Sequence, residues 1–181
     1  MADFKSSFDK GIGLEGGYEL TDIPGDKGGV TYAGISKNMH PTWTGWDKID
    51  NGVYDLRLVE SFYKTNFWNK ILGDNINSQI VAETIYLSSM NMGLSPIIKI
   101  TQKIVGCTPD GIFGKITLGK LNEATQDKKE EKIFILTFNL LIIFRYKNIC
   151  LSDNRRRLDK IVSNEKFLCG WINRVQKTVE L

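Results

Sequence analysis

A glycine-rich stretch near the N-terminus constrains the fold of this 181-residue chain more than any other segment does. Residues 15–35 read EGGYELTDIPGDKGGVTYAGI and contain two Gly-Gly pairs, at positions 16–17 and 28–29. Glycine has no side chain to bury and loses the most conformational freedom on folding, so such pairs occur where the backbone turns tightly or approaches another group. Apolar residues on both sides of the PGDKGG turn predict a small β-hairpin over residues 18–36.

Apolar residues outside this stretch recur with a helical period. Phe4, Phe8 and Ile12 predict a short amphipathic helix that ends at the first Gly-Gly pair. We expect further helices at 53–73, 76–93, 95–105, 115–124, 127–150, 153–162 and 164–178, with the 127–150 helix buried. The predicted fold class is therefore mainly α, an α+β bundle of helices with one small β-hairpin that carries the site.

Residues 39–52 are expected to form a loop with about one turn of helix, because they contain Pro41, Gly45 and Gly52. Trp43 and Trp46 in this loop fit two roles equally well, the edge of a surface groove or a small satellite core. His40 is the only histidine of the chain and lacks paired acidic residues nearby in the sequence, so we expect a structural or exposed role for it.

Composition excludes several classes of protein. The formal net charge of +3 is too small for a typical nucleic-acid-binding protein. The longest apolar run, residues 133–144, is shorter than the roughly 20 residues of a membrane span, so we expect no span. The N-terminus lacks the pattern of a signal peptide, which predicts synthesis in the cytoplasm. The three cysteines, at positions 107, 150 and 169, are widely spaced, and we expect free thiols in a reducing compartment.

Three polar residues in the glycine-rich stretch suit hydrolysis of a glycosidic bond. That reaction needs a carboxylic acid to protonate the leaving oxygen and a second carboxylate to activate water or stabilise positive charge. Glu15 follows an apolar helix, which favours its protonated form, whereas Asp26 lies in a polar turn and should stay ionised. Thr31 has a hydroxyl that can hold a water molecule. The same spacing also occurs in purely structural turns, and the chemistry requires no metal or organic cofactor.

The motifs of this stretch resemble those of the glycoside hydrolase 108 family of lysozyme-like N-acetylmuramidases. EGGY followed by DKGGVTYAGI is similar to the family's EGGY and DPGGxTxxGI motifs. Downstream, YKTNFWNKILGD, IYLSSMNMG, VGCTPDGIFGKIT and GWINRV resemble further family motifs in the same order, so the resemblance spans residues 4–175.

The resemblance implies a lysozyme-like fold that cleaves the bond between N-acetylmuramic acid and N-acetylglucosamine in peptidoglycan. By position, Glu15 would be the general acid, and Asp26 and Thr31 would position the attacking water. Residues 1–93 would form the catalytic region, and residues 94–181 a peptidoglycan-binding-like region packed on it. The expected substrate-binding residues lie in the matching motifs and are Tyr18, Tyr32, Asn91 and Asp110.

The chain departs from the family pattern at three places. The segment between Glu15 and Asp26 is about two residues longer than usual, which makes Asp22 a rival for the second carboxylate. Lys27 replaces a common proline, and Leu87 stands where the family often has an aspartate. Glu83 lies among apolar residues of a predicted helix, where either a solvated face or the cleft would suit it.

Two functional hypotheses follow. The first is an active peptidoglycan hydrolase that acts in the periplasm or cell wall, either as a phage endolysin released through a holin or as a bacterial effector that involves secretion machinery and an immunity protein. The second is a catalytically inactive peptidoglycan-binding or scaffold module, which the longer hairpin and Lys27 favour.

Overall fold

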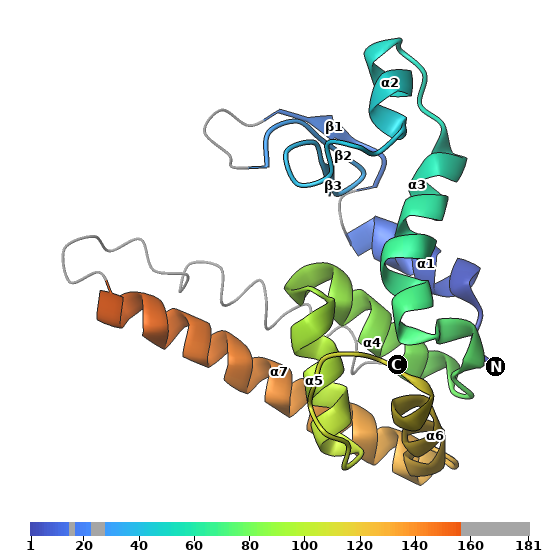
Figure 1. The fold of residues 1–181 in the computed structure, drawn as a ribbon, viewed down its shortest axis with the longest axis vertical. Helices are drawn as coiled ribbons and strands as arrows, with labels where there is room; N and C mark the ends of the chain where they lie inside the picture. Colours follow the sequence, from blue (N-terminus) through green and yellow to red (C-terminus); the bar gives the residue numbers. More distant parts are fainter. Residues whose placement is uncertain (15–16, 23–27, 157–181) are drawn as a thin grey trace. The chain divides into compact units, whose positions relative to one another are not determined.

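The structure is a computed structural model that describes residues 1–14, 17–22 and 28–156 (Figure 1). The chain divides into two compact units. The N-terminal unit comprises residues 3–74, and the C-terminal unit comprises residues 1–2 together with the chain from residue 75 onward. The predicted division into functional regions at residue 93 stays a prediction.

The N-terminal unit contains the predicted hairpin between short helices. Its elements are α1 (Phe4–Leu14), β1 (Leu20–Thr21), β2 (Thr31–Tyr32), β3 (Ile35–Ser36), α2 (Gly45–Asp50), α3 (Leu56–Tyr63), the π-helix η1 (Lys64–Trp68) and the 3₁₀-helix η2 (Asn69–Ile71). A further 3₁₀ turn, η3 (Gly73–Asn75), spans the boundary between the units. In the described residues the strands form one antiparallel sheet of order β1-β2-β3, so the hairpin gains a third strand that the sequence pattern did not predict.

Aromatic rings from both ends of the N-terminal unit form its core. The Phe4 ring lies 5.5 Å from that of Phe8 and 5.6 Å from that of Trp68, and Phe8 lies 6.0 Å from Tyr63, all measured between ring centroids. Trp68 is fully buried, and its Nε1 donates a hydrogen bond of 2.7 Å to Oδ1 of Asp74. Gly73 lies against the face of the same indole, where a Cβ atom would overlap the ring. These contacts join α1 to the end of the unit.

The two tryptophans of the 39–52 segment form a satellite core. Trp46 is buried, and its ring meets that of Trp43 edge-on at 5.1 Å. Trp43 also contacts Phe62 of α3, and His40 packs edge-on against Phe62 at 4.8 Å. The backbone oxygen of His40 accepts a hydrogen bond from Nε1 of Trp46. Of the two roles left open for these tryptophans, the structure shows packing, and His40 has the expected structural role.

The C-terminal unit is helical in the part that the structure describes. Its helices are α4 (Gln79–Met92), α5 (Leu94–Ile104), α6 (Lys115–Ala124) and α7 (Lys128–Arg156). Helix α5 contacts both α4 and α7, and α6 contacts α7 (Figure 1). The buried apolar residues come from all four helices and include Val81, Ile85, Ile97, Leu121, Phe138 and Ile142.

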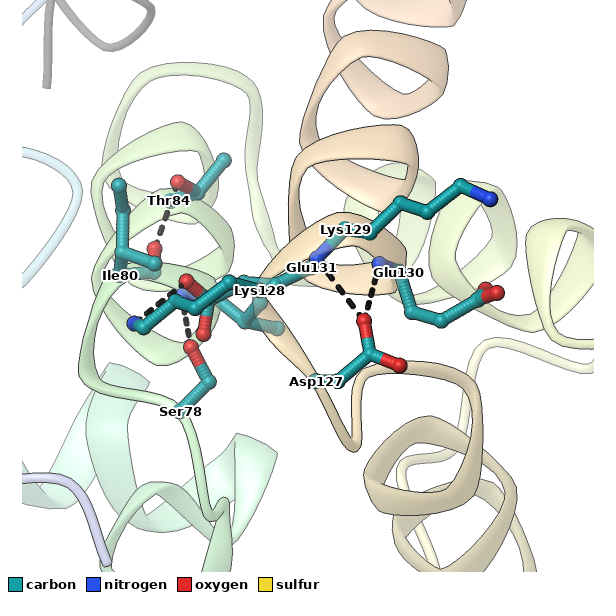
Figure 2. Close-up of polar contacts among 9 residues, drawn as sticks. Ser78, Ile80, Thr84, Asp127, Lys128, Lys129, Glu130 and Glu131 are labelled. Carbon is teal, nitrogen blue, oxygen red and sulfur yellow. Dashed lines mark hydrogen bonds and ion pairs between the residues drawn. The ribbon is translucent and has the colours of Figure 1, made fainter.

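Side-chain caps explain where α4 and α7 begin (Figure 2). Oγ of Ser78 accepts a hydrogen bond from the backbone N–H of Val81, so Ser78 is the N-cap residue of α4. Oδ1 of Asp127 accepts two bonds of 2.9 Å from the backbone N–H groups of Lys129 and Glu130 at the start of α7. Each cap satisfies donors that the first helical turn leaves without a partner.

The expectation that the long helix is buried is wrong for one of its faces. Phe134, Phe138 and Ile142 of α7 are buried, but Leu140 and Phe144 are each 57% exposed. The sequence period identified a helix with many apolar residues, and it could not show which of them find a partner. No described helix is long and apolar enough to cross a membrane.

Candidate functional site

The small sheet presents one polar and one apolar face. In an antiparallel sheet, directly paired residues point their side chains to the same face, and successive residues alternate. Thr31 pairs with Thr21 on one side and with Ser36 on the other, so three hydroxyl side chains share a face. The opposite face has Leu20, Tyr32 and Ile35. The first set, Thr21, Thr31 and Ser36, is called the hydroxyl face below.

The second Gly-Gly pair holds the hydroxyls of this face. Oγ1 of Thr31 donates to the backbone oxygen of Gly29 at 3.3 Å, and Oγ of Ser36 donates to that of Gly28 at 2.7 Å. Gly29 has a φ of +63°, and a Cβ there would lie 2.8 Å from Nδ2 of Asn38. Glycine is therefore required at this turn. Because the Thr31 hydroxyl donates its proton to Gly29, its oxygen lone pairs are directed to accept a bond, as from a water molecule.

The two predicted catalytic carboxylates, Glu15 and Asp26, lie outside the described residues. The structure describes what precedes and follows them. Helix α1 ends at Leu14, and the backbone N–H of Gly17 donates to the oxygen of Ile12 at 2.9 Å, a closure that spans position 15 in the sequence. Asp26 falls in the sequence between β1 and β2, and the rival Asp22 is an exposed residue directly after β1.

A tyrosine pair lies on the apolar face of the sheet. Tyr32 is 2% exposed, and its ring centroid lies 5.3 Å from that of Tyr54, which is 50% exposed. Burial raises the pKa of the Tyr32 hydroxyl, and the nearby Tyr18 and Tyr54 add to that rise. Tyr18 is 42% exposed and can present its ring to a ligand, whereas Tyr32 supports Tyr54 from the inside. Sequence reasoning did not select Tyr54, although an aromatic residue in the polar segment DNGVYD was a usable signal.

A hydrogen bond from α3 fixes the turn between β2 and β3. The hydroxyl of Tyr63 donates to the backbone oxygen of Ala33 at 2.8 Å, and Tyr63 is buried. Ala33 has a φ of +48°, a left-handed conformation that is uncommon for a residue with a Cβ. The sheet that carries Thr31 is therefore anchored to a helix that begins 25 residues further along the chain.

The other two predicted substrate-binding residues belong to the C-terminal unit. Asn91 is exposed in the last turn of α4. Asp110 lies in the turn between α5 and α6, where Oδ1 accepts bonds of 2.8 Å from the backbone N–H of Ile112 and 2.7 Å from Nε2 of Gln102. These bonds lower the pKa of the Asp110 carboxyl, the backbone bond most strongly.

Gln102 organises this turn from a buried position. Its Nε2 also donates to the backbone oxygen of Ile112, and its Oε1 accepts from the backbone N–H of Gly111 at 3.0 Å. Gln102 is 2% exposed. A single glutamine in a helical pattern carries no signal that distinguishes it from a solvent-facing one, which explains why sequence reasoning missed it. The structure shows that Asp110 forms the turn between α5 and α6. Its role in substrate binding stays a prediction.

Helix α4 places two further residues of interest in the interior. Glu83 is 3% exposed, so of the two positions left open for it the solvated face is wrong. Leu87, at the position where the related family often has an aspartate, is also buried. Within the described residues no group of three or more His, Cys, Asp or Glu side chains is arranged to hold a metal ion.

Comparison with known proteins finds similarity to a glycoside hydrolase family in the N-terminal part of the chain. The family model described as Glycosyl hydrolase 108 matches residues 8–93, a little under half of the chain. No curated protein matches the sequence. Among solved structures, that of Brucella abortus SagA matches with a TM-score of 0.72 and 22% identity, over 98% of this chain and 91% of that chain. This likeness confirms the predicted α+β lysozyme-like fold. The predicted resemblance to the glycosyl hydrolase 108 family is confirmed as well, by the match of its family model to residues 8–93.

Proposed function

We propose that this protein is an N-acetylmuramidase that cleaves the β-1,4 bond between N-acetylmuramic acid and N-acetylglucosamine in peptidoglycan. The observation that carries the proposal is the family match over residues 8–93, which includes the whole glycine-rich stretch and the sheet. A glycosidase of this family needs two carboxyl groups and a bound water. The glycine-rich stretch has two carboxyl groups, those of Glu15 and Asp26, and a hydroxyl, that of Thr31, which can bind the water.

Each residue has a distinct role in the proposed reaction. Glu15 protonates the glycosidic oxygen, so that the leaving sugar departs as an alcohol. In the sequence Glu15 follows the apolar residues of α1, and an apolar environment would disfavour the charged form of its carboxyl. Asp26 accepts a proton from the attacking water, and Thr31 orients that water through its hydroxyl oxygen. An inverting reaction follows if the water lies between the two carboxyl groups.

The proposed site of action is the cell wall or periplasm. Release through a holin, as for a phage endolysin, and delivery by a secretion machine, as for an effector with an immunity protein, both suit this activity. A neighbouring holin gene or immunity gene would distinguish the two routes.

The decisive experiment uses purified sacculi and the Glu15→Gln variant. Wild-type protein should reduce the turbidity of the sacculi, and mass spectrometry should find new reducing ends on muramic acid. The amide preserves the shape of the side chain and removes the acid, so we expect a loss of activity of at least about 10²-fold. Binding of the variant to sacculi should persist in a co-sedimentation assay.

Wild-type protein that binds sacculi without cleaving them would contradict the proposal and support the inactive binding module. New reducing ends on N-acetylglucosamine would show a different glycosidase. Asp26→Asn and Asp22→Asn serve as a matched pair for the second carboxylate, and we expect the greater loss with Asp26→Asn. The reverse order would assign this role to Asp22.

A further inference from the structure

Helix α7 has apolar side chains on two opposite faces. Its inner face is buried in the C-terminal unit, where the helix contacts α4, α5 and α6. The buried residues of that face recur every four positions and are Phe134, Phe138, Ile142 and Tyr146. A helix with this single row would suit the surface of a globular unit.

The opposite face has a second apolar row, which is exposed. It consists of Ile133, Leu136, Leu140 and Phe144, with exposed fractions of 49%, 44%, 57% and 57%. Their spacing of three, four and four residues makes each one a neighbour of the next on the helix surface, over an axial length of about 17 Å. This set is called the outer row below. Contiguous exposed apolar side chains of this kind mark a surface that binds a protein or a membrane.

Lysine side chains border the outer row at both of its ends. Lys129 lies four residues before Ile133, and Lys147 lies three residues after Phe144, so each is adjacent to the row. Both lysines are exposed, and the 18 residues between them correspond to five helical turns, which places them on the same side of the helix. Lys132, also exposed, lies four residues before Leu136.

Acidic side chains do not cancel this positive border. Within residues 129–149 the acidic residues are Glu130 and Glu131. Glu131 is buried, and its Oε1 pairs with Nζ of Lys128 at 3.0 Å. Glu130 is exposed but points about 100° away from Lys129 around the helix axis. In Figure 2 the side chain of Lys129 extends away from α4. The outer row is therefore an apolar surface with a positive margin.

We propose that α7 binds the surface of an anionic lipid bilayer through the outer row. A helix with an apolar face bordered by lysines lies in the plane of the interface, with its apolar side chains among the upper parts of the acyl chains. The lysine stems lie along the apolar surface while their ammonium groups reach the anionic headgroups. This inference is independent of the proposed glycosidase activity, since it involves neither carboxylate of the glycine-rich stretch.

Charge disfavours a second copy of the chain as the occupant. An antiparallel pair of α7 helices packed along their outer rows would place Lys129 of one copy beside Lys147 of the other, and a parallel pair would place each lysine beside its counterpart. Both arrangements bring like charges together. A stable protein interface also buries about 800 Å² on each partner, which four side chains do not supply alone. An anionic bilayer offers negative charge and apolar chains side by side, and it has no such minimum area.

Flotation of the full-length protein with lipid vesicles tests the proposal. Wild-type protein should bind vesicles of equal parts phosphatidylcholine and phosphatidylglycerol, and it should bind vesicles of phosphatidylcholine alone at least about tenfold more weakly. Leu140→Ser and Phe144→Ser each remove an apolar side chain from the row, so each should weaken binding by about tenfold. Ile116→Ser is the matched control, because Ile116 of α6 is 77% exposed and lies outside the row.

A second pair of variants tests the lysine border. Lys147→Glu should weaken binding to the anionic vesicles by at least about fivefold, because it reverses a charge at the headgroups. Lys115→Glu makes the same change of net charge at an exposed position of α6 and should retain the wild-type affinity. All of these positions are solvent-exposed, so the thermal midpoint of each variant should stay close to that of the wild type.

Four results would overturn the proposal. Wild-type protein that binds neither kind of vesicle would exclude a lipid surface and favour a protein partner with an acidic border. Unchanged binding by both Leu140→Ser and Phe144→Ser would place the contact elsewhere. An equal loss in Ile116→Ser or Lys115→Glu would show that the contact is not specific to the outer row. A wild-type dimer that becomes a monomer in Leu140→Ser by light scattering would assign the row to a second copy.

Discussion

At the scale of single residues, the hydroxyl face shows how backbone geometry orients the hydroxyl group of a side chain. Thr31 donates its proton to the backbone oxygen of Gly29, and the left-handed turn at Gly29 brings that oxygen within reach. The hydroxyl oxygen is therefore oriented as an acceptor before any ligand arrives. Orientation of this kind lowers the cost of positioning a water molecule for reaction.

Thr31→Val tests the role of this hydroxyl. Valine has nearly the same shape but cannot hold a water molecule, so activity on sacculi should fall about 10²-fold while thermal stability changes little. Thr21→Val removes a hydroxyl from the paired position on the same face and should retain most activity. Full activity of Thr31→Val would exclude a role for Thr31 in the reaction.

Gly73 offers a second residue-scale prediction, about stability. Because its Cα packs against the Trp68 indole, Gly73→Ala should overpack the core and lower the free energy of unfolding by about 1–3 kcal/mol. Gly119→Ala is the control, since a Cβ at this position of α6 meets no atom within 4 Å. It should raise the stability by about 0.5–1 kcal/mol. Urea unfolding of the two variants measures both changes, and a stabilised Gly73→Ala protein would contradict this account of the core.

At the scale of elements, helix ends and turns show how polar groups set the fold. Ser78, Asp127 and Asp55 each accept a backbone N–H bond at the start of a helix. Asp55 also pairs with the side chain of Arg57, which lowers the pKa of its carboxyl. The turn between α5 and α6 uses the same chemistry, with Asp110 and Gln102 as its polar centre.

This turn should make stability depend on pH. The hydrogen bonds to Asp110 lower its pKa in the folded state relative to the ordinary value of 3.8. A lowered carboxyl pKa stabilises the folded state above the ordinary value, and this stabilisation disappears as the pH falls through the folded-state pKa. Wild type should therefore exceed Asp110→Asn in urea midpoint above about pH 5, and the difference should vanish at lower pH. A difference that is constant with pH would exclude the charge of Asp110 as its source.

Several elements were predictable because their sequence patterns are local. The period of Phe4, Phe8 and Ile12 identified α1, and the glycines around residues 28–29 identified the hairpin. Other features depend on contacts between distant segments. Strand β3 forms beside β2 in a turn held by Tyr63, and the burial of Gln102 depends on how α5 and α6 meet. The spacing of apolar residues in 133–144 predicts a helix, but it does not show which of these residues are buried and which are exposed.

At the scale of the whole molecule, charge affects how the protein meets its proposed substrate. A net charge of +3 gives a weak, screened attraction to an anionic cell wall. Binding to sacculi should then depend mainly on contacts at short range. The same weak charge explains why composition excluded typical nucleic-acid-binding proteins without identifying a function.

Co-sedimentation of Glu15→Gln with sacculi at low and high salt checks this view. An increase in ionic strength from about 0.01 M to 0.15 M shortens the screening length from roughly 30 Å to 8 Å. We expect the affinity to weaken by no more than about tenfold over this range. A loss of several orders of magnitude would instead indicate binding dominated by a concentrated basic surface.

The bond between Tyr63 and Ala33 has a consequence for how the length of the chain before Thr31 can vary. Each strand of the sheet contributes only two residues, so the strands alone determine their alignment weakly. The hydrogen bond from Tyr63 of α3 fixes the β2–β3 turn from outside the sheet. The alignment of these strands therefore does not depend on the connection between β1 and β2. A longer sequence between the two strands then costs little, since each doubling of the length of a loop adds only about 0.6 kcal/mol. An insertion of two residues between Glu15 and Asp26 is accordingly compatible with an unchanged position of Thr31.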